Sequence, residues 1–175
     1  MKDKRLLLPI LSLIIVFSLV STAAAALELD AKAALLMDAK SGRILYADNI
    51  DAPLPVASLT KMMTLTVVLE AIDRGEFQLT DVITASPHAA SKRGSRIWLE
   101  AGEQMTLDEL LYAIAVGSAN DAAVAVAEYI AGSEDDFVAL MNQRARELGL
   151  ENSYFVNSSG LPLDNGTEHT MTARD

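Results

Sequence analysis

Three helices with clear start and stop signals follow one another between residues 106 and 149, and they constrain the fold more than any other feature. Thr106 and Glu109 form a capping-box pattern before "LDELLYAIAVGS". Asn120 can cap a second helix, and Ser133 can cap a third that is acidic in its first turn and basic later, as the helix dipole prefers. A glycine follows each of these two helices. The sequence therefore predicts a block of packed helices.

Shorter periodic patterns come before this block. Residues 33–38 and 43–47 are apolar-rich and flank a Lys-Ser-Gly turn, which predicts a β-hairpin. "QLTDVITAS" is a further short strand candidate. From Ser58 onwards the period becomes that of a helix buried on most sides, ending near residues 74 and 75. Strands followed by a helical block indicate an α+β fold, here with too few strands to complete its antiparallel sheet.

The first 25 residues have the pattern of a secretory signal peptide. A positively charged start precedes the apolar run "LLLPILSLIIVFSLV", and "STAAAA" supplies small residues for cleavage after Ala25. A retained membrane anchor is the alternative interpretation, because the run is only slightly short of a spanning helix. Pro9 and the alanine-rich exit favour cleavage. We therefore expect an exported, extracytoplasmic protein whose mature part, residues 26–175, forms one domain.

Composition narrows the possible partners. The formal net charge of −10 argues against binding to nucleic acid and against electrostatic adhesion to anionic lipid. Because the sequence contains no cysteine, no disulfide can support the exported fold. The two histidines lie far apart and outside any usual metal-ligand spacing. We therefore expect neither a metal nor another cofactor.

One polar pair stands out at the start of the predicted apolar helix. The stretch "PVASLTKMMT" sets Ser58 three residues before Lys61, which puts both side chains on one helix face. A serine hydroxyl needs a neighbouring base to become a good nucleophile, and a lysine can be that base when burial lowers its pKa. Lys61 is the only charge in residues 55–67, which favours this interpretation. The alternative is an ordinary helix cap at Ser58 followed by an exposed lysine.

A second polar cluster, "VGSAND", lies at the junction of two helices that we expect to be largely buried. Ser118 and Asn120 need partners there, because polar side chains in apolar surroundings cost stability when unpaired. In one interpretation, Asn120 caps the second helix and Ser118 fills the turn. In the other, the Ser118 hydroxyl passes a proton beside Lys61, while the Asn120 amide holds a substrate carbonyl and the lysine. The residues alone leave both interpretations open.

Together the two clusters resemble the active-site motifs of serine-type D-alanyl-D-alanine carboxypeptidases, the low-molecular-mass penicillin-binding proteins of peptidase family S11. Ser58 and Lys61 match the S-x-x-K motif of this wider group, and Ser118 to Asn120 match its S-D-N motif with alanine in the middle. The likeness runs over the whole mature chain, including "LEAGEQMTLDELLYAIAVGSANDAAVAVAEYIAG" and "FVALMNQRARELGLENSYFVNSSGL". This length makes the resemblance specific.

The resemblance implies a β-lactamase/transpeptidase-like fold and a fixed set of roles. Ser58 would attack the terminal D-Ala-D-Ala amide of a peptidoglycan pentapeptide and become acylated, with Lys61 as base and not as part of the core. Ser118 and Asn120 would complete the proton relay and hold the substrate, and water would then release the shortened peptide. β-Lactam antibiotics would acylate the same Ser58.

Three departures from the family pattern matter. Met171 stands where the family usually has a hydroxyl residue. Ala119 in the second motif resembles carboxypeptidases more than class A β-lactamases. The family's third motif, K-T-G, is absent, and in the family it lies on a strand beyond this C-terminus. Thr172 is placed to cap a helix where the sequence stops. We therefore expect the chain to hold only the first part of a catalytic domain and to be inactive alone.

Two competing interpretations remain: a related β-lactamase, and a non-catalytic remnant that binds the cell wall. The resemblance to the carboxypeptidase family implies that any membrane association would depend on a C-terminal region that this chain does not contain.

Overall fold

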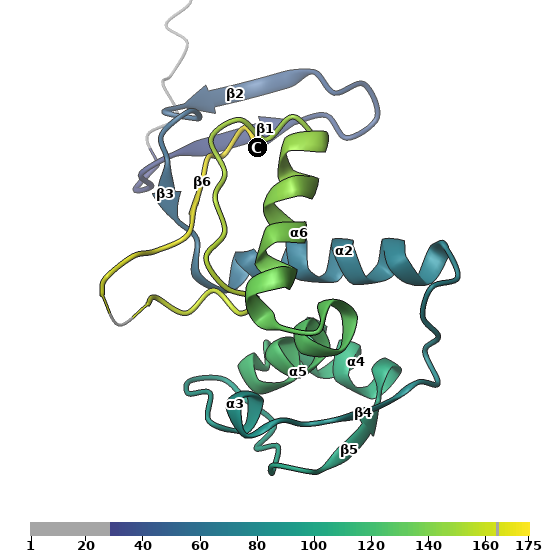
Figure 1. The fold of residues 1–175 in the computed structure, drawn as a ribbon. Coiled ribbons are helices and arrows are strands. Elements are labelled where there is room, and N and C mark those ends of the chain that lie inside the picture. Colours follow the sequence, from purple (N-terminus) through teal and green to yellow (C-terminus); the bar gives the residue numbers. More distant parts are fainter. Residues whose placement is uncertain (1–28, 164) are drawn as a thin grey trace, which may run out of the picture. The chain divides into compact units, whose positions relative to one another are not determined.

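The computed structural model describes residues 29–163 and 165–175, and every helix and strand discussed here lies within residues 32–175. The predicted signal peptide at residues 1–25 lies outside the described residues. Among the helices of the described part, none is both long enough and apolar enough to span a membrane. Figure 1 shows that the longer helices gather in one block, with pairs of short strands along its borders.

The predicted β-hairpin is confirmed. β1 (Ala34–Met37) pairs antiparallel with β2 (Ile44–Asp48). In the connecting turn, the Asp38 carboxylate accepts a hydrogen bond of 2.8 Å from the backbone N–H of Ser41. Such a bond from an aspartate to the backbone three residues later stabilises a tight turn locally. The short-range signal in the sequence was therefore sufficient to specify this element.

The strand candidate near residue 80 is also confirmed. β4 (Val82–Thr84) pairs antiparallel with β5 (Gln104–Thr106), the segment that leads into the capping box. Between these strands the chain forms a one-turn helix, α3 (Pro87–Ala90), which the sequence analysis did not predict. Ser86 caps α3 through its side chain. The serine before a proline at the first helical position is a start signal that was overlooked there.

Residues 170 and 171 form a strand directly before Thr172, and residues 172–175, the predicted helix start, form neither strand nor helix. β3 (Leu54–Pro55) pairs antiparallel with β6 (Thr170–Met171). The Thr172 hydroxyl does accept a bond of 3.1 Å from the N–H of Asp175, as a cap would. This bond alone does not specify a helix, because the same local contact also closes a turn. The pairing brings the end of the chain beside the segment that leads to Ser58.

The helical block is built from elements whose boundaries agree well with the capping signals. The capping box of Thr106 and Glu109 is present, and Ser133 caps its helix as predicted. Gly132 ends the preceding helix with a φ of 84°, a conformation that glycine adopts without strain. The block consists of α2 (Thr60–Asp73), α4 (Leu107–Gly117), α5 (Asn120–Ala131) and α6 (Glu134–Glu147).

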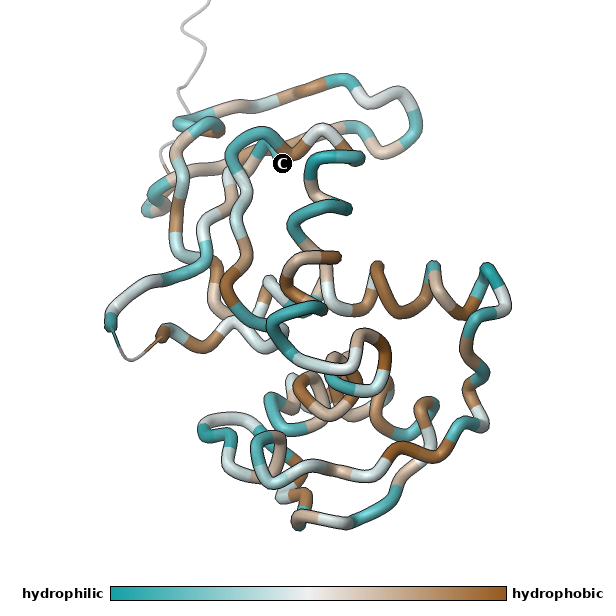
Figure 2. Tube along the Cα trace, viewed as in Figure 1, coloured by the Kyte–Doolittle hydropathy of each residue, from teal (hydrophilic) through white to brown (hydrophobic). Residues whose placement is uncertain are grey.

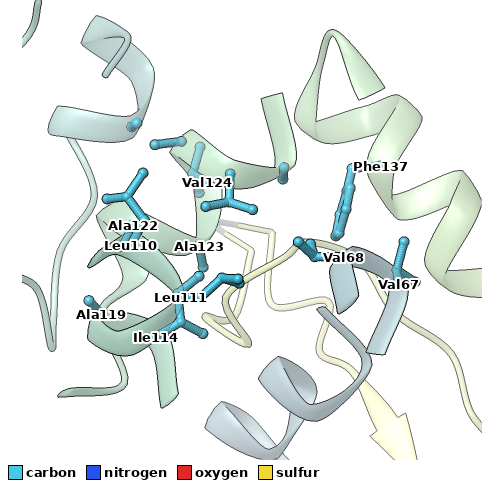
Figure 3. Packing of buried hydrophobic residues seen from close by; sticks show 14 of the residues in the cluster. Val67, Val68, Leu110, Leu111, Ile114, Ala119, Ala122, Ala123, Val124 and Phe137 are labelled. Carbon is cyan, nitrogen blue, oxygen red and sulfur yellow. The ribbon is translucent and has the colours of Figure 1, made fainter. Parts of the chain in front are cut away.

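The hydrophobic core lies where these helices meet (Figure 3). Val68 of α2 and Phe137 of α6 are fully buried, as are Leu110 and Ile114 of α4. Burying a side chain of this size stabilises the fold by roughly 1.5–3 kcal/mol. The buried part of α5 is made mainly of alanine and valine, whose small side chains allow the neighbouring helices to approach closely.

The helix α2 is less completely buried than predicted. Its inner face contains Lys61, Thr64 and Val68, whereas Met62 and Leu69 are 63% and 52% exposed. Figure 2 shows that α2 is mainly apolar along its length. The spacing of apolar residues in the sequence could not identify the buried face of α2, because apolar residues occupy both faces.

The predicted α+β class is confirmed, with antiparallel strands next to a helical block. In the described residues, the strands form separate two-stranded sheets and not one continuous sheet.

Candidate active site

Ser58 lies on a 3₁₀ helix, η1 (Ala57–Leu59), that leads directly into α2. The N-cap residues of η1 and α2 are Val56 and Leu59, and neither helix has a side-chain cap, so the cap interpretation of Ser58 is wrong. The Ser58 side chain is exposed. Its hydroxyl makes no hydrogen bond within the described part of the chain. Ala57 has a φ of 45°, a region that residues with side chains rarely adopt, and this turns the backbone sharply just before Ser58.

Lys61 is buried at the start of α2, with only 4% of its surface exposed, so the exposed-lysine alternative is wrong. Its Nζ donates hydrogen bonds of 2.7 Å to Asn120 Oδ1 and 2.6 Å to the backbone carbonyl of Ser159. Both acceptors are neutral. Burial lowers the pKa of Lys61 to about 8, because it disfavours the charged form. At pH 7, roughly one such lysine in ten is neutral and able to take a proton.

Ser58 and Lys61 therefore differ in exposure. Ser58 is exposed to solvent, and Lys61 is buried one turn further along. No hydrogen bond joins the Ser58 hydroxyl and the Lys61 amine among the described residues. Their pairing in catalysis stays a prediction.

Asn120 is the first residue of α5 and not its cap. The N-cap residue is Ala119, and no side chain caps this helix, so the capping prediction was wrong. Instead, both the oxygen and the nitrogen of the buried Asn120 amide make hydrogen bonds. Its Oδ1 accepts from Lys61, and its Nδ2 donates a bond of 2.6 Å to the carbonyl of Arg93. The expected contact between Asn120 and the lysine is present, while its contact with substrate stays a prediction.

Ser118 ends α4 in the left-handed conformation, with a φ of 53°. Its Oγ is buried and has no hydrogen-bond partner among the described residues. A buried hydroxyl without a partner costs roughly 1–3 kcal/mol, which is a high cost for a residue that only fills a turn. The proton-relay role of Ser118 stays a prediction.

The sequence analysis missed a loop that completes the surroundings of Lys61. Residues 157–160, "NSSG", are organised by Asn157, whose Oδ1 accepts bonds from the backbone N–H groups of Ser159 and Gly160. The loop thereby presents the Ser159 carbonyl to Lys61. An asparagine followed closely by glycine is a turn signal that sequence reasoning could have used. Nothing in those four residues indicates their distant lysine partner.

Gly160 of this loop lies against the segment that carries Ser58. Its φ is 86°, and a Cβ at this position would lie 2.0 Å from the Ala57 carbonyl oxygen and 3.2 Å from the Ser58 backbone nitrogen. A side chain cannot fit there unless one of the two segments moves. The loop therefore contacts both Lys61 and the turn that exposes Ser58.

Both histidines lie outside any metal site. Within the described residues, no group of His, Cys, Asp and Glu side chains is arranged to hold a metal ion. His169 is buried, its Nε2 lies 3.1 Å from Asn157 Oδ1, and burial lowers its pKa. His169 therefore packs against the 157–160 loop through its contact with Asn157.

Comparison with known proteins agrees with this geometry. The family model for D-alanyl-D-alanine carboxypeptidases, peptidase family S11, matches residues 20–175. The chain belongs to this family. The resemblance seen in the sequence motifs is therefore confirmed over nearly the whole mature chain.

Two curated relatives show how far the likeness to the S11 family extends. The D-alanyl-D-alanine carboxypeptidase DacF of Bacillus subtilis is 48% identical over 132 residues, which cover 75% of this chain and 34% of the relative. The corresponding enzyme DacC of Escherichia coli is 38% identical over 154 residues, which cover 85% of this chain and 38% of the relative. The chain thus spans somewhat more than a third of the length of these S11 relatives.

Solved structures agree on the fold. The D-alanyl-D-alanine carboxypeptidase DacD from Francisella tularensis matches with a TM-score of 0.81 at 40% identity, covering 85% of this chain and 35% of that structure. Penicillin-binding protein D2 from Listeria monocytogenes, solved in an ampicillin-bound form, matches with a TM-score of 0.69 at 32% identity, covering 85% of this chain and 59% of that one. The predicted penicillin-binding-protein fold of this S11 chain is confirmed.

The close approach of Gly160 predicts the effect of adding one methyl group. We expect Gly160→Ala to displace the turn at Ala57 and Ser58, because the new Cβ would overlap the Ala57 carbonyl. In a version of the protein with the length of its relatives, labelling of Ser58 by a fluorescent penicillin should slow by at least about tenfold, and the melting temperature should fall. Gly149→Ala is the matched control, because Gly149 also has a positive φ but has open space around its Cβ position. Equal labelling rates in the two variants would show that the contact at Gly160 does not support the site.

Proposed function

We propose that this protein is a serine D,D-carboxypeptidase, which removes the terminal D-alanine from peptidoglycan stem peptides through an acyl-enzyme. One observation carries the proposal: an exposed serine, whose hydroxyl has no partner in the described residues, lies three residues before a buried lysine whose hydrogen-bond acceptors there are both neutral oxygens. The lowered pKa makes neutral Lys61 available near physiological pH. Such a base is what a serine needs to become a nucleophile.

In the proposed reaction, the Ser58 Oγ attacks the carbonyl carbon of the penultimate D-alanine, and its proton passes to Lys61 Nζ. The C–N bond to the terminal D-alanine then breaks, and the leaving amine receives a proton through the Ser118 hydroxyl. The Asn120 amide holds the substrate carbonyl. Water hydrolyses the ester of Ser58, with Lys61 again taking a proton, and this step releases the shortened peptide. No step requires a metal or another cofactor.

β-Lactam antibiotics belong to the same proposal. Their strained amide presents a carbonyl to Ser58, and the ring-opened product remains attached as an ester. A carboxypeptidase should hold this penicilloyl ester for a long time, whereas a related β-lactamase should hydrolyse it quickly. The lifetime of the adduct therefore distinguishes the proposed function from that alternative.

Residues 1–25 lead us to propose export to the cell envelope, where peptidoglycan lies. The support is the charged start, the apolar run and the alanine-rich exit of the sequence.

Acylation of Ser58 is the first test. In a version of the protein with the length of its relatives, we expect labelled penicillin to attach at Ser58 and Ser58→Ala to remove the label. Lys61→Met should slow labelling at least about a hundredfold, because the general base is lost. Peptide mapping by mass spectrometry checks the position, and a label on any other residue would refute the assignment.

The structure changes one expectation about the lysine variant. Lys61 was expected to lie outside the core, but it is buried and its Nζ serves Asn120 Oδ1 and the Ser159 carbonyl. Lys61→Met leaves both oxygens without this donor, at a cost of roughly 1–3 kcal/mol. A melting curve must therefore show that the variant is folded before its rate is interpreted.

Turnover by residues 26–175 alone is the second test. The family's K-T-G motif is absent from this sequence, and the strand that carries it is implied to hold the substrate and part of the oxyanion hole. Loss of one such donor costs on the order of a hundred- to a thousandfold in rate. We therefore expect no D-alanine release by residues 26–175 and clear release by a version extended through a K-T-G motif. Comparable release by both would show that the site is complete without it.

Export is the third test. We expect the mature protein recovered from the cell envelope to begin near Ala26, because small residues precede this position. N-terminal sequencing checks this, and a mature protein that still begins at Met1 would contradict cleavage.

A further inference from the structure

We infer that Glu134 is a positioning residue for Lys61, because it fastens the two chain segments whose carbonyls orient Lys61 and Asn120. Glu134 belongs to neither active-site motif, and it is separated from Lys61 by more than seventy residues of sequence. The inference rests on the proposed function only for its effect on rate. Its effect on the position and the pKa of Lys61 depends on the fold alone and not on the proposed function.

Glu134 is the first residue of α6, and its side chain is only 10% exposed. Its Oε1 accepts hydrogen bonds from Ser158, 3.1 Å from the backbone nitrogen and 2.7 Å from the hydroxyl. Its Oε2 accepts a bond of 2.9 Å from Lys92 Nζ and lies 3.0 Å from Nε2 of His88 on α3. One carboxylate thus joins the start of α6, the 157–160 loop and the segment from α3 to Lys92.

We call the contacts of the Glu134 carboxylate the Glu134 clamp, and its connection through Ser158 the first arm. The first arm leads to Lys61 through the 157–160 loop. Ser158, which Glu134 holds, directly precedes Ser159, whose carbonyl accepts the bond from Lys61. The Ser158 carbonyl is itself fixed by the Thr64 hydroxyl of α2, at 2.7 Å. Because the peptide unit is planar, fixing both sides of Ser158 limits the directions in which the next carbonyl can point.

The second arm is the connection through Lys92, and it leads to Lys61 through Asn120. Lys92, which Glu134 also holds, directly precedes Arg93, whose carbonyl accepts the bond from Asn120 Nδ2. The Oδ1 of the same amide accepts from Lys61 Nζ. Both arms therefore end at one lysine amine. Loosening either arm moves an acceptor away from Lys61 and opens its surroundings to water.

The charge state of Glu134 suits this role. Burial raises the pKa of its carboxyl, but the bonds from Lys92 and Ser158 outweigh burial, and the net pKa is lowered. Glu134 is thus ionised at neutral pH and accepts all of its bonds as a carboxylate. A buried carboxylate of this kind must keep its partners, because an unpaired buried charge is strongly unfavourable.

A matched pair of variants separates this role from a general effect on α6. Glu134→Gln keeps an oxygen that accepts from Ser158, but its NH₂ group cannot accept from Lys92, so the second arm is lost. Asp135→Asn is the control, because Asp135 lies in the same first turn, is exposed, and makes no hydrogen bond within the described residues. Both variants remove one negative charge from the same helix terminus.

The decisive measurement is the pKa of the Lys61 amine, followed by NMR of ¹³C-labelled lysine and assigned by loss of its signal in Lys61→Met. We expect a value near 8 in the unaltered protein and in Asp135→Asn. In Glu134→Gln we expect a rise of about one pH unit, because water reaches the amine, and a tenfold smaller neutral fraction at pH 7. Loss of a negative charge by itself would lower the lysine pKa. A pKa that is unchanged or lowered in Glu134→Gln would therefore overturn the inference.

A second variant covers the case in which Glu134→Gln does not fold. Ser158→Ala removes only the hydroxyl bond of the first arm and leaves the backbone bond in place. We expect a smaller rise of the Lys61 pKa in the same direction, and no rise would overturn the inference. Ser58 labelling by penicillin adds a rate: it should slow about tenfold in Glu134→Gln and not in Asp135→Asn. These rates are measured in a version of the protein with the length of its relatives. If that version is not labelled at all, the proposed function fails, and the Lys61 titration still decides the role of Glu134.

Discussion

The site depends on one interaction, the burial of the Lys61 amine between two neutral oxygens. A buried ammonium is costly unless it is paired with an anion, and no carboxylate is hydrogen-bonded to Lys61 in the described residues. The pKa therefore falls to about 8. Asn120 Oδ1 and the Ser159 carbonyl satisfy two of the three donors of the charged form without stabilising its charge as a carboxylate would. Because these oxygens come from α5 and the 157–160 loop, the helical block must assemble before the pKa of the lysine is lowered.

The serine depends on a second constraint, which lies in the backbone. Ala57 adopts a positive φ just before Ser58, and Gly160 leaves no room for a side chain beside it. Strained conformations of this kind persist only when the surrounding structure holds them. Here the support comes from the same loop that contacts Lys61. The exposure of Ser58 and the burial of Lys61 are therefore two results of one packing arrangement.

Local signals in the sequence predicted local structure well. The capping box at Thr106, the cap at Ser133 and the stop at Gly132 are all present, because each depends on contacts within a few residues. The hairpin followed from its turn for the same reason. At Thr172 the predicted capping bond is present, but residues 173–175 form no helix, because one local bond does not fix a helical turn.

The long-range partners of the site could not be predicted in the same way. The spacing of Ser58 and Lys61 indicated the pair, but the sequence left open whether the lysine is buried or exposed. Asn120 was correctly associated with Lys61 but was also wrongly given the role of helix cap, since asparagine before an alanine-rich helix is typical of both. The Ser159 carbonyl carries no sequence signal, because every residue has a backbone carbonyl. Glu134 resembled an ordinary first-turn acid, and only the fold shows that its carboxylate is bound on both oxygens.

The central claim is that Lys61, with a pKa lowered by burial, is the base that activates Ser58. It is tested most directly by the pH dependence of the rate of Ser58 acylation by a penicillin, measured from pH 6 to pH 11 in a protein of the relatives' length. A rate that rises with pH and levels off above a midpoint near 8 is the predicted result, because the neutral amine is formed as pH rises through its pKa. A midpoint near 10.4, the ordinary value for lysine, or a rate that does not change with pH would contradict the claim.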